Sequence, residues 1–412
     1  MTLFKNRILP LLFLVFISVS ANAQENLENR LKSLEAEVKA LRSHLAAQAS
    51  SGQQPKAKSP GSGIELGGYG EFHMNFAEGK NGDYYDLHRL VLYVGYSWNE
   101  WLKFHSEFEV EHAFVADGEG GELVVEQAYV DALLRDGFNL RAGRMLVPLG
   151  ITNEEHEPET FNGVERPLFD KYIIPTTWST DGVGFWGYLD DQAQLSYKLY
   201  VGSGLDGAQF NAKDGIRGGR LHERPGLHEP AIMAKVSYSP LGNGQRGRMP
   251  LRIGLASYWS GLNNANMGNG SVDGRIWIDA VDLIANAGPF ELKAVAAYEK
   301  IDGALEIGNG TASRIFGWYA ELGMHCMPEF MKVGKLKASD LVLFARYDDV
   351  NTQYRMPEGV SRNPAGDRSA WTFGISFKPV SNFVVKVDYQ VQEDETANDL
   401  PNLINVGVGF SF

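Results

Sequence analysis

The sequence contains 412 residues, with 46 glycines, 11% aromatic residues and a single cysteine, Cys326. One cysteine excludes a disulfide-rich scaffold, and a formal net charge of −13 provides no basic surface of the kind that binds nucleic acid. Abundant glycine and aromatic residues in a chain of this length favour a large all-β protein made of turns and alternating strands.

Residues 1–23 have the pattern of a secretory signal peptide. The basic residues Lys5 and Arg7 precede an apolar run over residues 8–19, and the small residues that follow end at Ala23. This order of basic, apolar and small residues predicts cleavage after Ala23. An uncleaved membrane anchor is the alternative interpretation, although the apolar run is shorter than a spanning helix requires.

Residues 24–49 predict a short helix that forms a coiled coil. Apolar residues recur there at alternating spacings of four and three, which gives a heptad seam of about three repeats. The seam consists of Leu27, Leu31, Leu34, Val38, Leu41 and Leu45. A single amphipathic helix that lies on another surface is the alternative. Residues 50–63 are rich in proline, glycine, serine and lysine without periodicity, which predicts a flexible linker.

Residues 64–412 alternate between apolar and polar positions in segments of roughly ten residues. Over residues 101–112, for example, Leu102, Phe104 and Phe108 share one side while the opposite side is charged. A β-strand places two such sets on opposite faces. The alternation and the turn-rich stretches between segments predict sixteen strands, over residues 64–76, 84–98, 101–113, 122–134, 138–147, 181–189, 193–202, 230–239, 250–260, 272–285, 290–301, 313–325, 339–349, 369–378, 382–392 and 402–412.

Three features favour lipid rather than water outside these strands. The polar faces are too charged for a solvent-excluded interior, the connections alternate between short and long, and aromatic residues collect near strand ends. These aromatic residues are Tyr96, Trp98, Trp101, Phe185, Trp186, Tyr188, Tyr258, Trp259, Trp318 and Tyr319. The prediction is an all-β, 16-stranded antiparallel transmembrane β-barrel in outer-membrane lipid, with polar faces toward a watery lumen. The links at 240–249 and 326–338 are longer than periplasmic turns should be, which indicates irregular connections or a misplaced strand.

The end of the predicted fifth strand carries the most specific motif of the chain. This is the segment LRAGRMLVPLG, in which Gly143, Arg144, Pro148 and Gly150 are the distinctive positions. Together with the signal-peptide pattern, the heptad seam, the sixteen strands and the terminal FSF, it resembles the phosphate-selective porin O and P family over residues 64–412. The resemblance implies a homotrimer of barrels in the bacterial outer membrane, each with its third loop folded into the lumen as a constriction. It also implies that arginines and lysines line the path of phosphate.

The polar faces of the predicted strands supply the candidate lumen-lining residues. These are Arg89, Lys103, Glu107, Glu109, Arg141, Lys198, Lys235, Arg252, Lys293, Arg346 and Lys378. We expect them to face a passage for small hydrophilic solutes or ions, with phosphate among the candidates.

The longest link, over residues 147–180, is rich in carboxylates. The candidate constriction residues in and beside it are Arg144, Glu154, Glu155, His156, Glu157, Glu159, Glu165 and Arg166. Apolar residues over 168–178 are costly to expose, so we expect that half to pack against the barrel wall and the charged half to face the passage. The glutamates depart from a basic anion trap, because a ring of carboxylates favours cations and repels phosphate. Passive diffusion of small hydrophilic solutes is therefore favoured over a specific filter, and a transverse field between opposed acidic and basic residues is the alternative.

Other classes of function have less support. Glu154, Glu155, His156 and Glu157 are metal-ligand types, but adjacent positions do not converge without a specific fold, so no metal and no cofactor is expected. No nucleophile motif accompanies His156, and the chain is not expected to be an enzyme. The remaining alternative is an envelope structural or adhesive protein whose coiled coil contacts the cell wall while the barrel only anchors it.

Overall fold

The computed structural model of the chain describes residues 63–79, 82–112, 120–220, 224–242, 250–265, 268–269, 272–396 and 400–412. The predicted signal peptide at 1–23, the coiled-coil helix at 24–49 and all but the last residue of the linker at 50–63 lie outside these residues. Among the helices that the structure describes, none has the length and apolar character needed to cross a membrane.

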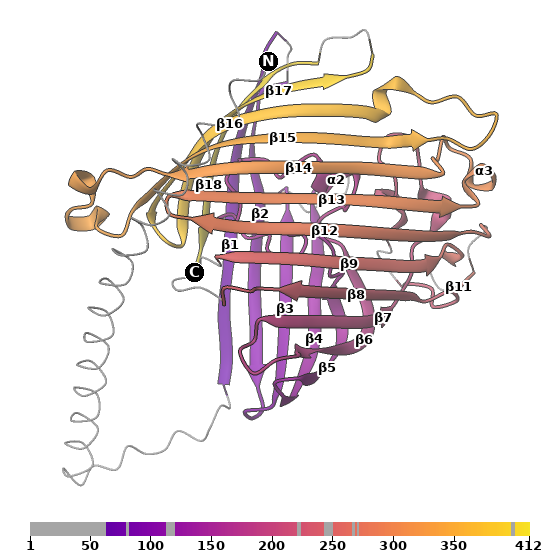
Figure 1. Cartoon of the computed structure of the whole chain (residues 1–412), viewed down its shortest axis with the longest axis horizontal. Helices are drawn as coiled ribbons and strands as arrows, with labels where there is room; N and C mark the ends of the chain where they lie inside the picture. The colour runs from indigo at the N-terminus through magenta and orange to yellow at the C-terminus, as the bar shows by residue number, and fades with distance from the viewer. Residues whose placement is uncertain are drawn as a thin grey trace, which may run out of the picture. The chain divides into compact units, whose positions relative to one another are not determined.

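The described residues form a closed barrel of sixteen antiparallel strands (Figure 1). Each strand pairs with its neighbours in the sheet, and β1 pairs with β18 to close the barrel, which leaves no free edge. The strands are β1 (Gly63–Ala77), β2 (Tyr84–Ser97), β3 (Leu102–Glu111), β4 (Glu122–Arg135), β5 (Phe138–Leu146), β6 (Ser179–Tyr188), β7 (Leu195–Gly202), β8 (Ala231–Tyr238), β9 (Leu251–Gly261), β12 (Arg275–Ala287), β13 (Phe290–Asp302), β14 (Arg314–His325), β15 (Asp340–Arg355), β16 (Asp367–Val380), β17 (Phe383–Asp394) and β18 (Leu403–Ser411). Each predicted segment overlaps one of these strands, so the sixteen-stranded barrel is confirmed.

Short elements occupy several of the connections. They are α2 (Phe169–Tyr172), η1 (Gly207–Gln209), η2 (Arg217–Gly219), the hairpin β10 (Asn264–Ala265) and β11 (Gly268–Asn269), α3 (Ala304–Ile307), η3 (Glu329–Met331), η4 (Gly334–Leu336) and η5 (Pro364–Gly366). Because η3 and η4 fill the link over residues 326–338, that link is irregular and no strand was misplaced there. In the other long link, residues 243–249 lie outside the described part of the chain.

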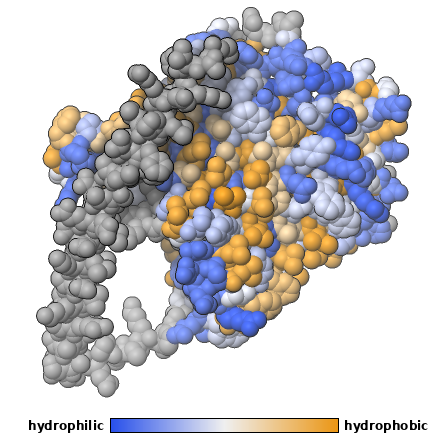
Figure 2. All heavy atoms as spheres, in the orientation of Figure 1, coloured by the Kyte–Doolittle hydropathy of each residue, from blue (hydrophilic) through white to orange (hydrophobic). Residues whose placement is uncertain are grey.

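The outward face of the barrel is apolar, as the alternation predicts. On β12, Trp277 and Val281 are exposed, while Ile276 and Ile278 on either side of Trp277 are buried. Figure 2 shows a patch of hydrophobic side chains on the visible face. Exposed Trp and Tyr side chains also stand near strand ends, but Tyr258 and Tyr319 are buried inside the barrel and cannot belong to an interfacial girdle.

Part of the barrel interior is apolar, which corrects the expectation of polar inner faces throughout. The segment between β5 and β6 buries an apolar half against the inner faces of β7 to β14. The contributing residues include Val147, Leu149, Ile151, Phe169, Ile173, Ile174 and Trp178 from the segment and Tyr200, Met233, Tyr258, Ile278, Val295 and Tyr319 from the wall. Full burial of a large apolar side chain contributes about 1.5–3 kcal/mol, so this cluster fixes the segment inside the barrel. The predicted packing of the apolar half against the wall is confirmed.

Candidate functional site

The segment over residues 147–178, called the third loop here, crosses the interior from β5 and β6 to the opposite wall. The Val164 amide donates to Asp388 Oδ2 on β17 at 2.6 Å, and Ser376 Oγ on β16 donates to the Asn162 carbonyl at 2.6 Å. Asn162 also donates its side-chain amide to Glu321 Oε1 on β14 at 2.8 Å. Hydrogen bonds to three distant strands therefore hold the middle of the loop.

Wall lysines bind the main chain of the third loop. A lysine ammonium from each of four strands, β8, β13, β16 and β17, donates to a loop carbonyl oxygen. The pairs are Lys235 to Gly150 at 2.7 Å, Lys293 to Thr160 at 2.6 Å, Lys378 to Glu159 at 2.7 Å and Lys386 to Gly163 at 2.9 Å. Three of these lysines were predicted to line the lumen, and the structure turns them toward the loop.

The first two glutamates of the third loop are paired with wall cations. Glu154 forms ion pairs with Lys198 on β7 and with Lys235, whose Nζ lies 2.7 Å from Glu154 Oε2. Burial alone would raise the pKa of Glu154, but the two ammonium groups lower it well below its ordinary value. Glu155 forms an ion pair with Arg252 on β9. The negative charge in this part of the loop is therefore largely neutralised.

The later glutamates meet different partners. Glu165 accepts hydrogen bonds from Asn75 at 2.9 Å and lies 3.1 Å from His73 Nδ1, both on β1. Burial opposes its ionisation, yet the contact with His73 lowers its pKa to about 2. Glu157 accepts a long hydrogen bond of 3.5 Å from the Tyr93 hydroxyl, and Glu159 Oε1 is buried without a hydrogen-bond partner among the described residues.

The predicted arginines have separate surroundings. Arg144 makes two hydrogen bonds to Asp181 on β6, at 2.6 and 2.9 Å, so it ties strands together and is not brought to the acidic loop. Arg166 donates to Thr176 Oγ1 and to the His156 carbonyl, both at 3.1 Å, so it braces the loop on itself.

The remaining predicted wall residues lie on inner faces in ion pairs of their own. Arg89 pairs with Glu109 at 3.2 Å, Arg141 with Asp131 at 2.8 Å, and Arg346 with Asp348 at 2.9 Å. Lys103 on β3 stands opposite Asp131 in the register of β3 and β4. Arg346 is only 1% exposed and also reaches the Glu165 carbonyl, so it lies behind the loop rather than on open solvent.

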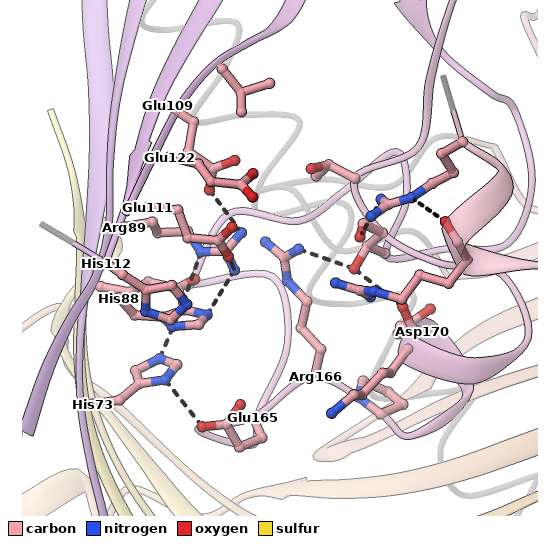
Figure 3. A pocket seen from close by; sticks show the side chains of 18 of the residues that line it. His73, His88, Arg89, Glu109, Glu111, His112, Glu122, Glu165, Arg166 and Asp170 are labelled. Atoms are coloured by element: carbon pink, nitrogen blue, oxygen red, sulfur yellow. Dashed lines mark hydrogen bonds and ion pairs between the residues drawn. The ribbon is translucent and has the colours of Figure 1, made fainter. Parts of the chain in front are cut away.

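A cavity of about 400 Å³ opens between the third loop and the polar inner wall of β1 to β4. Its wall side carries the carboxylates Glu71, Glu109, Glu111 and Glu122 together with Arg89 and Arg144. Its other lining residues include Arg166, Lys171, Glu165 and Asp170 of the third loop, and Arg217 and Arg220 of the connection between β7 and β8. Figure 3 shows the labelled wall glutamates and histidines on one side of this cavity and Arg166 across from them. Opposed charges of this kind set up a transverse field.

Two further cavities lie nearer the ends of the tight turns. One of about 420 Å³ is lined by Arg141, Lys198, Lys235 and Arg252, and another of about 320 Å³ is lined by Glu107, His156 and Glu157. Both are also lined by Glu154, so they adjoin one another. Neither shares a described lining residue with the cavity of Figure 3.

A buried ionic cluster borders the smaller of these two cavities. His156 Nε2 lies 3.3 Å from Glu107 Oε1 and 3.7 Å from Glu126 Oε2, and all three residues are at most 4% exposed. Burial alone would lower the pKa of His156, but the two carboxylates raise it above its ordinary value.

Sequence reasoning missed Glu126 because of a β-bulge. In simple alternation, Glu126 shares a face with Ala128 and Val130 and would point outward with them. The register between β3 and β4 shifts next to Glu126, and this shift turns its side chain into the barrel. No local sequence signal marks that bulge.

Comparison with known proteins agrees with this architecture. The model of the family described as phosphate-selective porin O and P matches residues 67–412. An uncharacterized protein of Aquifex aeolicus (strain VF5) is 33% identical over 350 residues, which cover 81% of this chain and 76% of that protein. The anion-selective porin from Comamonas acidovorans is similar with a TM-score of 0.52 and 14% identity, over 85% of this chain and 100% of that one. The trimer form of OmpT, an outer membrane protein of Vibrio cholerae folded in vitro, is similar with a TM-score of 0.51 and 11% identity, over 85% and 100% of the two chains.

Proposed function

Because the chain belongs to the phosphate-selective porin O and P family, it is an outer-membrane channel for passive diffusion, and we propose that solutes pass beside the third loop, along β1 to β9. The cavities on this side support that path, because their linings are polar and charged. The apolar cluster of the third loop and β7 to β14 fills another part of the interior. The third loop is then the constriction.

We infer weak ion selectivity rather than a phosphate trap. The observation that carries this inference is the pairing of Glu154 and Glu155 with Lys198, Lys235 and Arg252, which cancels charge of both signs. In a narrow aqueous passage only uncompensated fixed charges act strongly on a passing ion. The cavity of Figure 3, called the outer cavity here, adds a transverse field between its wall glutamates and the arginines and lysine that face them, which suits small polar solutes and ions of either sign. Phosphate is one candidate among them.

The assembly is proposed to be a homotrimer in outer-membrane lipid. Its support is the family and the fold shared with OmpT, whose structure is a trimer form. We further propose that residues 1–23 are removed as a signal peptide, that residues 24–49 form a coiled coil and that residues 50–63 link it to the barrel. In this proposal the coiled coil is available for contact with the cell wall, and the chain has no catalytic activity.

Single-channel recording in planar bilayers tests the proposed function. The expected result is stable conductance, a small reversal potential in a potassium chloride gradient, and phosphate that competes only weakly with chloride. Strong anion preference with block by low phosphate concentrations contradicts the weak selectivity. Folded protein that inserts but does not conduct favours the alternative, an envelope protein with a barrel anchor.

A further inference from the structure

Three ligand-type side chains from separate elements converge in the buried cluster that borders the smaller cavity. Glu107 comes from β3, Glu126 from the bulge in β4 and His156 from the third loop. One ligand atom of each residue lies within 4.8 Å of those of the other two. The neighbours of His156 in the sequence do not join them, because Glu154, Glu155 and Glu157 point to other partners.

The separations within this cluster fit metal ligands better than hydrogen bonds. A hydrogen bond between an imidazolium and a carboxylate is about 2.7–2.9 Å long. Ligands bound about 2.0–2.2 Å from a tetrahedral zinc ion stand about 3.3–3.6 Å apart. The observed distances from His156 Nε2 are 3.3 Å to Glu107 and 3.7 Å to Glu126. Small movements would therefore complete the coordination.

Charge and hydrogen bonding in the cluster are incomplete as they stand. Among the described residues, the ion pairs of Glu107 and Glu126 are with His156 alone, since Arg89 is bound to Glu71 and Glu109. Two buried carboxylates face one imidazole here, and Arg166, the further cation near it, donates to Thr176 and to the His156 carbonyl. Glu126 Oε2, on a residue only 2% exposed, has no hydrogen-bond partner in the described part of the chain. A divalent ion would satisfy this oxygen and balance the charge.

We propose that Glu107, Glu126 and His156 bind one divalent transition-metal ion of the zinc class, which fastens the third loop to β3 and β4. Two carboxylates and one imidazole suit zinc and its first-row neighbours, whereas calcium and magnesium prefer oxygen ligands alone. Binding requires Nε2 to be free of a proton, so the proton of His156 on that atom leaves to solvent. The fourth position is filled by water or by a solute from the adjoining cavity.

Two other groups of ligand-type residues line the outer cavity or lie beside it. In the group of Glu71, His73 and His88, the guanidinium of Arg89 already occupies the place of a cation, 2.8 Å from His88 Nε2 and 3.5 Å from Glu71. In the group of Asp86, His88 and His112, Asp86 Oδ2 lies 3.0 and 2.8 Å from the two imidazole nitrogens, which are hydrogen-bond distances. These groups are explained without a metal.

The site is tested by treating the folded full chain in detergent with a chelator, removing the chelator, and then measuring equilibrium binding of zinc. The expected result is one zinc ion per chain, with cobalt substitution giving the visible absorption bands of a tetrahedral site. Glu126→Gln and His156→Gln should weaken zinc binding by about 100-fold or more, beyond the 10–100-fold typical of outer-shell partners. The matched control Glu291→Gln removes a lumenal glutamate that pairs with Lys293 and should leave affinity unchanged.

Each other outcome overturns the proposal. If the wild type does not bind zinc or cobalt stoichiometrically, the proposal is overturned by that measurement alone, even if the variants fail to fold. Binding that is lost in Asp86→Asn but kept in Glu126→Gln would place the metal at the histidines of the outer cavity. Because binding is measured in detergent, its failure is distinguishable from failure of the proposed diffusion path, which is measured across a bilayer.

Discussion

Lys235 on β8 and Glu154 on the third loop form a buried ion pair at 2.7 Å, although 81 residues separate them in the sequence. The same ammonium donates to the Gly150 carbonyl at 2.7 Å and lies 3.2 Å from Asp282 Oδ2 on β12. Asp282 is only 1% exposed. One buried cation thus joins the loop to two strands of the wall, and its loss would leave acidic groups unpaired in the interior.

Replacement of Lys235 with methionine should lower the free energy of unfolding by about 3–5 kcal/mol, because removal of one partner leaves buried carboxylates without their counter-charge. The lower end is expected, since Lys198 still pairs with Glu154. Urea unfolding in detergent measures this change, and single-channel records should become noisier as the loop loosens. Lys300→Met is the matched control, because Lys300 pairs with Asp302 on the exposed surface. An equal loss of stability in both variants would contradict a special role for Lys235.

Glu165 should make stability depend on acid. Its pKa in the folded chain is about 2, below the ordinary value of 4.5, because contact with His73 outweighs the opposing effect of burial. The ionised form is therefore favoured by folding, so its contribution is complete above pH 4.5 and is lost as the pH falls toward 2. In Glu165→Gln the unfolding midpoint should vary less between pH 4.5 and 2 than in the wild type. If the unfolding midpoint of Glu165→Gln varies with pH as steeply as that of the wild type over this window, the contact with His73 does not stabilise the ionised form of Glu165.

Asp170 should have the opposite dependence. Burial raises its pKa from 3.8 to about 7, and Asp170 Oδ2 has no hydrogen-bond partner among the described residues. Between these pH values the unfolded chain ionises Asp170 while the folded chain keeps it protonated, so this residue destabilises the fold progressively up to pH 7. Asp170→Asn should therefore raise the free energy of unfolding at pH 8, on the order of 2–4 kcal/mol, and change it little at pH 3. A gain of equal size at both pH values would point to a cause other than ionisation.

The strands could be predicted from the sequence because alternation is a local property. The four lysine contacts to the third loop could not, since they join residues far apart in the chain: Lys386 and the Gly163 carbonyl are separated by 223 positions. An inward-facing lysine looks the same in sequence whether it meets water or a loop carbonyl. Only the closed barrel, with the loop inside it, decides between these two environments.

Only the part of the candidate site that depends on local sequence could be predicted. The apolar half of the third loop could be identified, because Phe169, Ile173 and Trp178 are unfavourable in water wherever the loop lies. The partners of each glutamate depend on which strand stands opposite, and that depends on barrel closure and on the bulge at Glu126. Composition alone therefore overstated the free negative charge of the loop.

The transverse field of the outer cavity predicts opposite effects from its two sides. Removal of negative charge by the pair Glu111→Gln and Glu122→Gln should shift the reversal potential in a potassium chloride gradient toward anions. Removal of positive charge by Arg217→Gln should shift it toward cations, because all three residues line the same cavity. Both shifts should shrink at 1 M salt, where the screening length is about 3 Å. Shifts of the same sign would show that these residues do not act on ions through their charge.

Gly409 should be essential for seating the third loop against β18. A Cβ atom at this position would lie 2.3 Å from Pro158 Cβ and 2.9 Å from its Cγ, so the loop packs directly on the backbone of the strand. Overpacking of this kind costs typically about 1–3 kcal/mol. Gly409→Ala should therefore displace Pro158, speed cleavage of the third loop by added protease and broaden the distribution of channel conductance. Gly63→Ala is the control, since nothing lies within 4 Å of the added atom. The added methyl group is expected to leave the register of the barrel strands unchanged, so any effect comes through the third loop. If the Gly409→Ala variant keeps wild-type conductance and protease resistance, the third loop moves aside freely and does not define the passage.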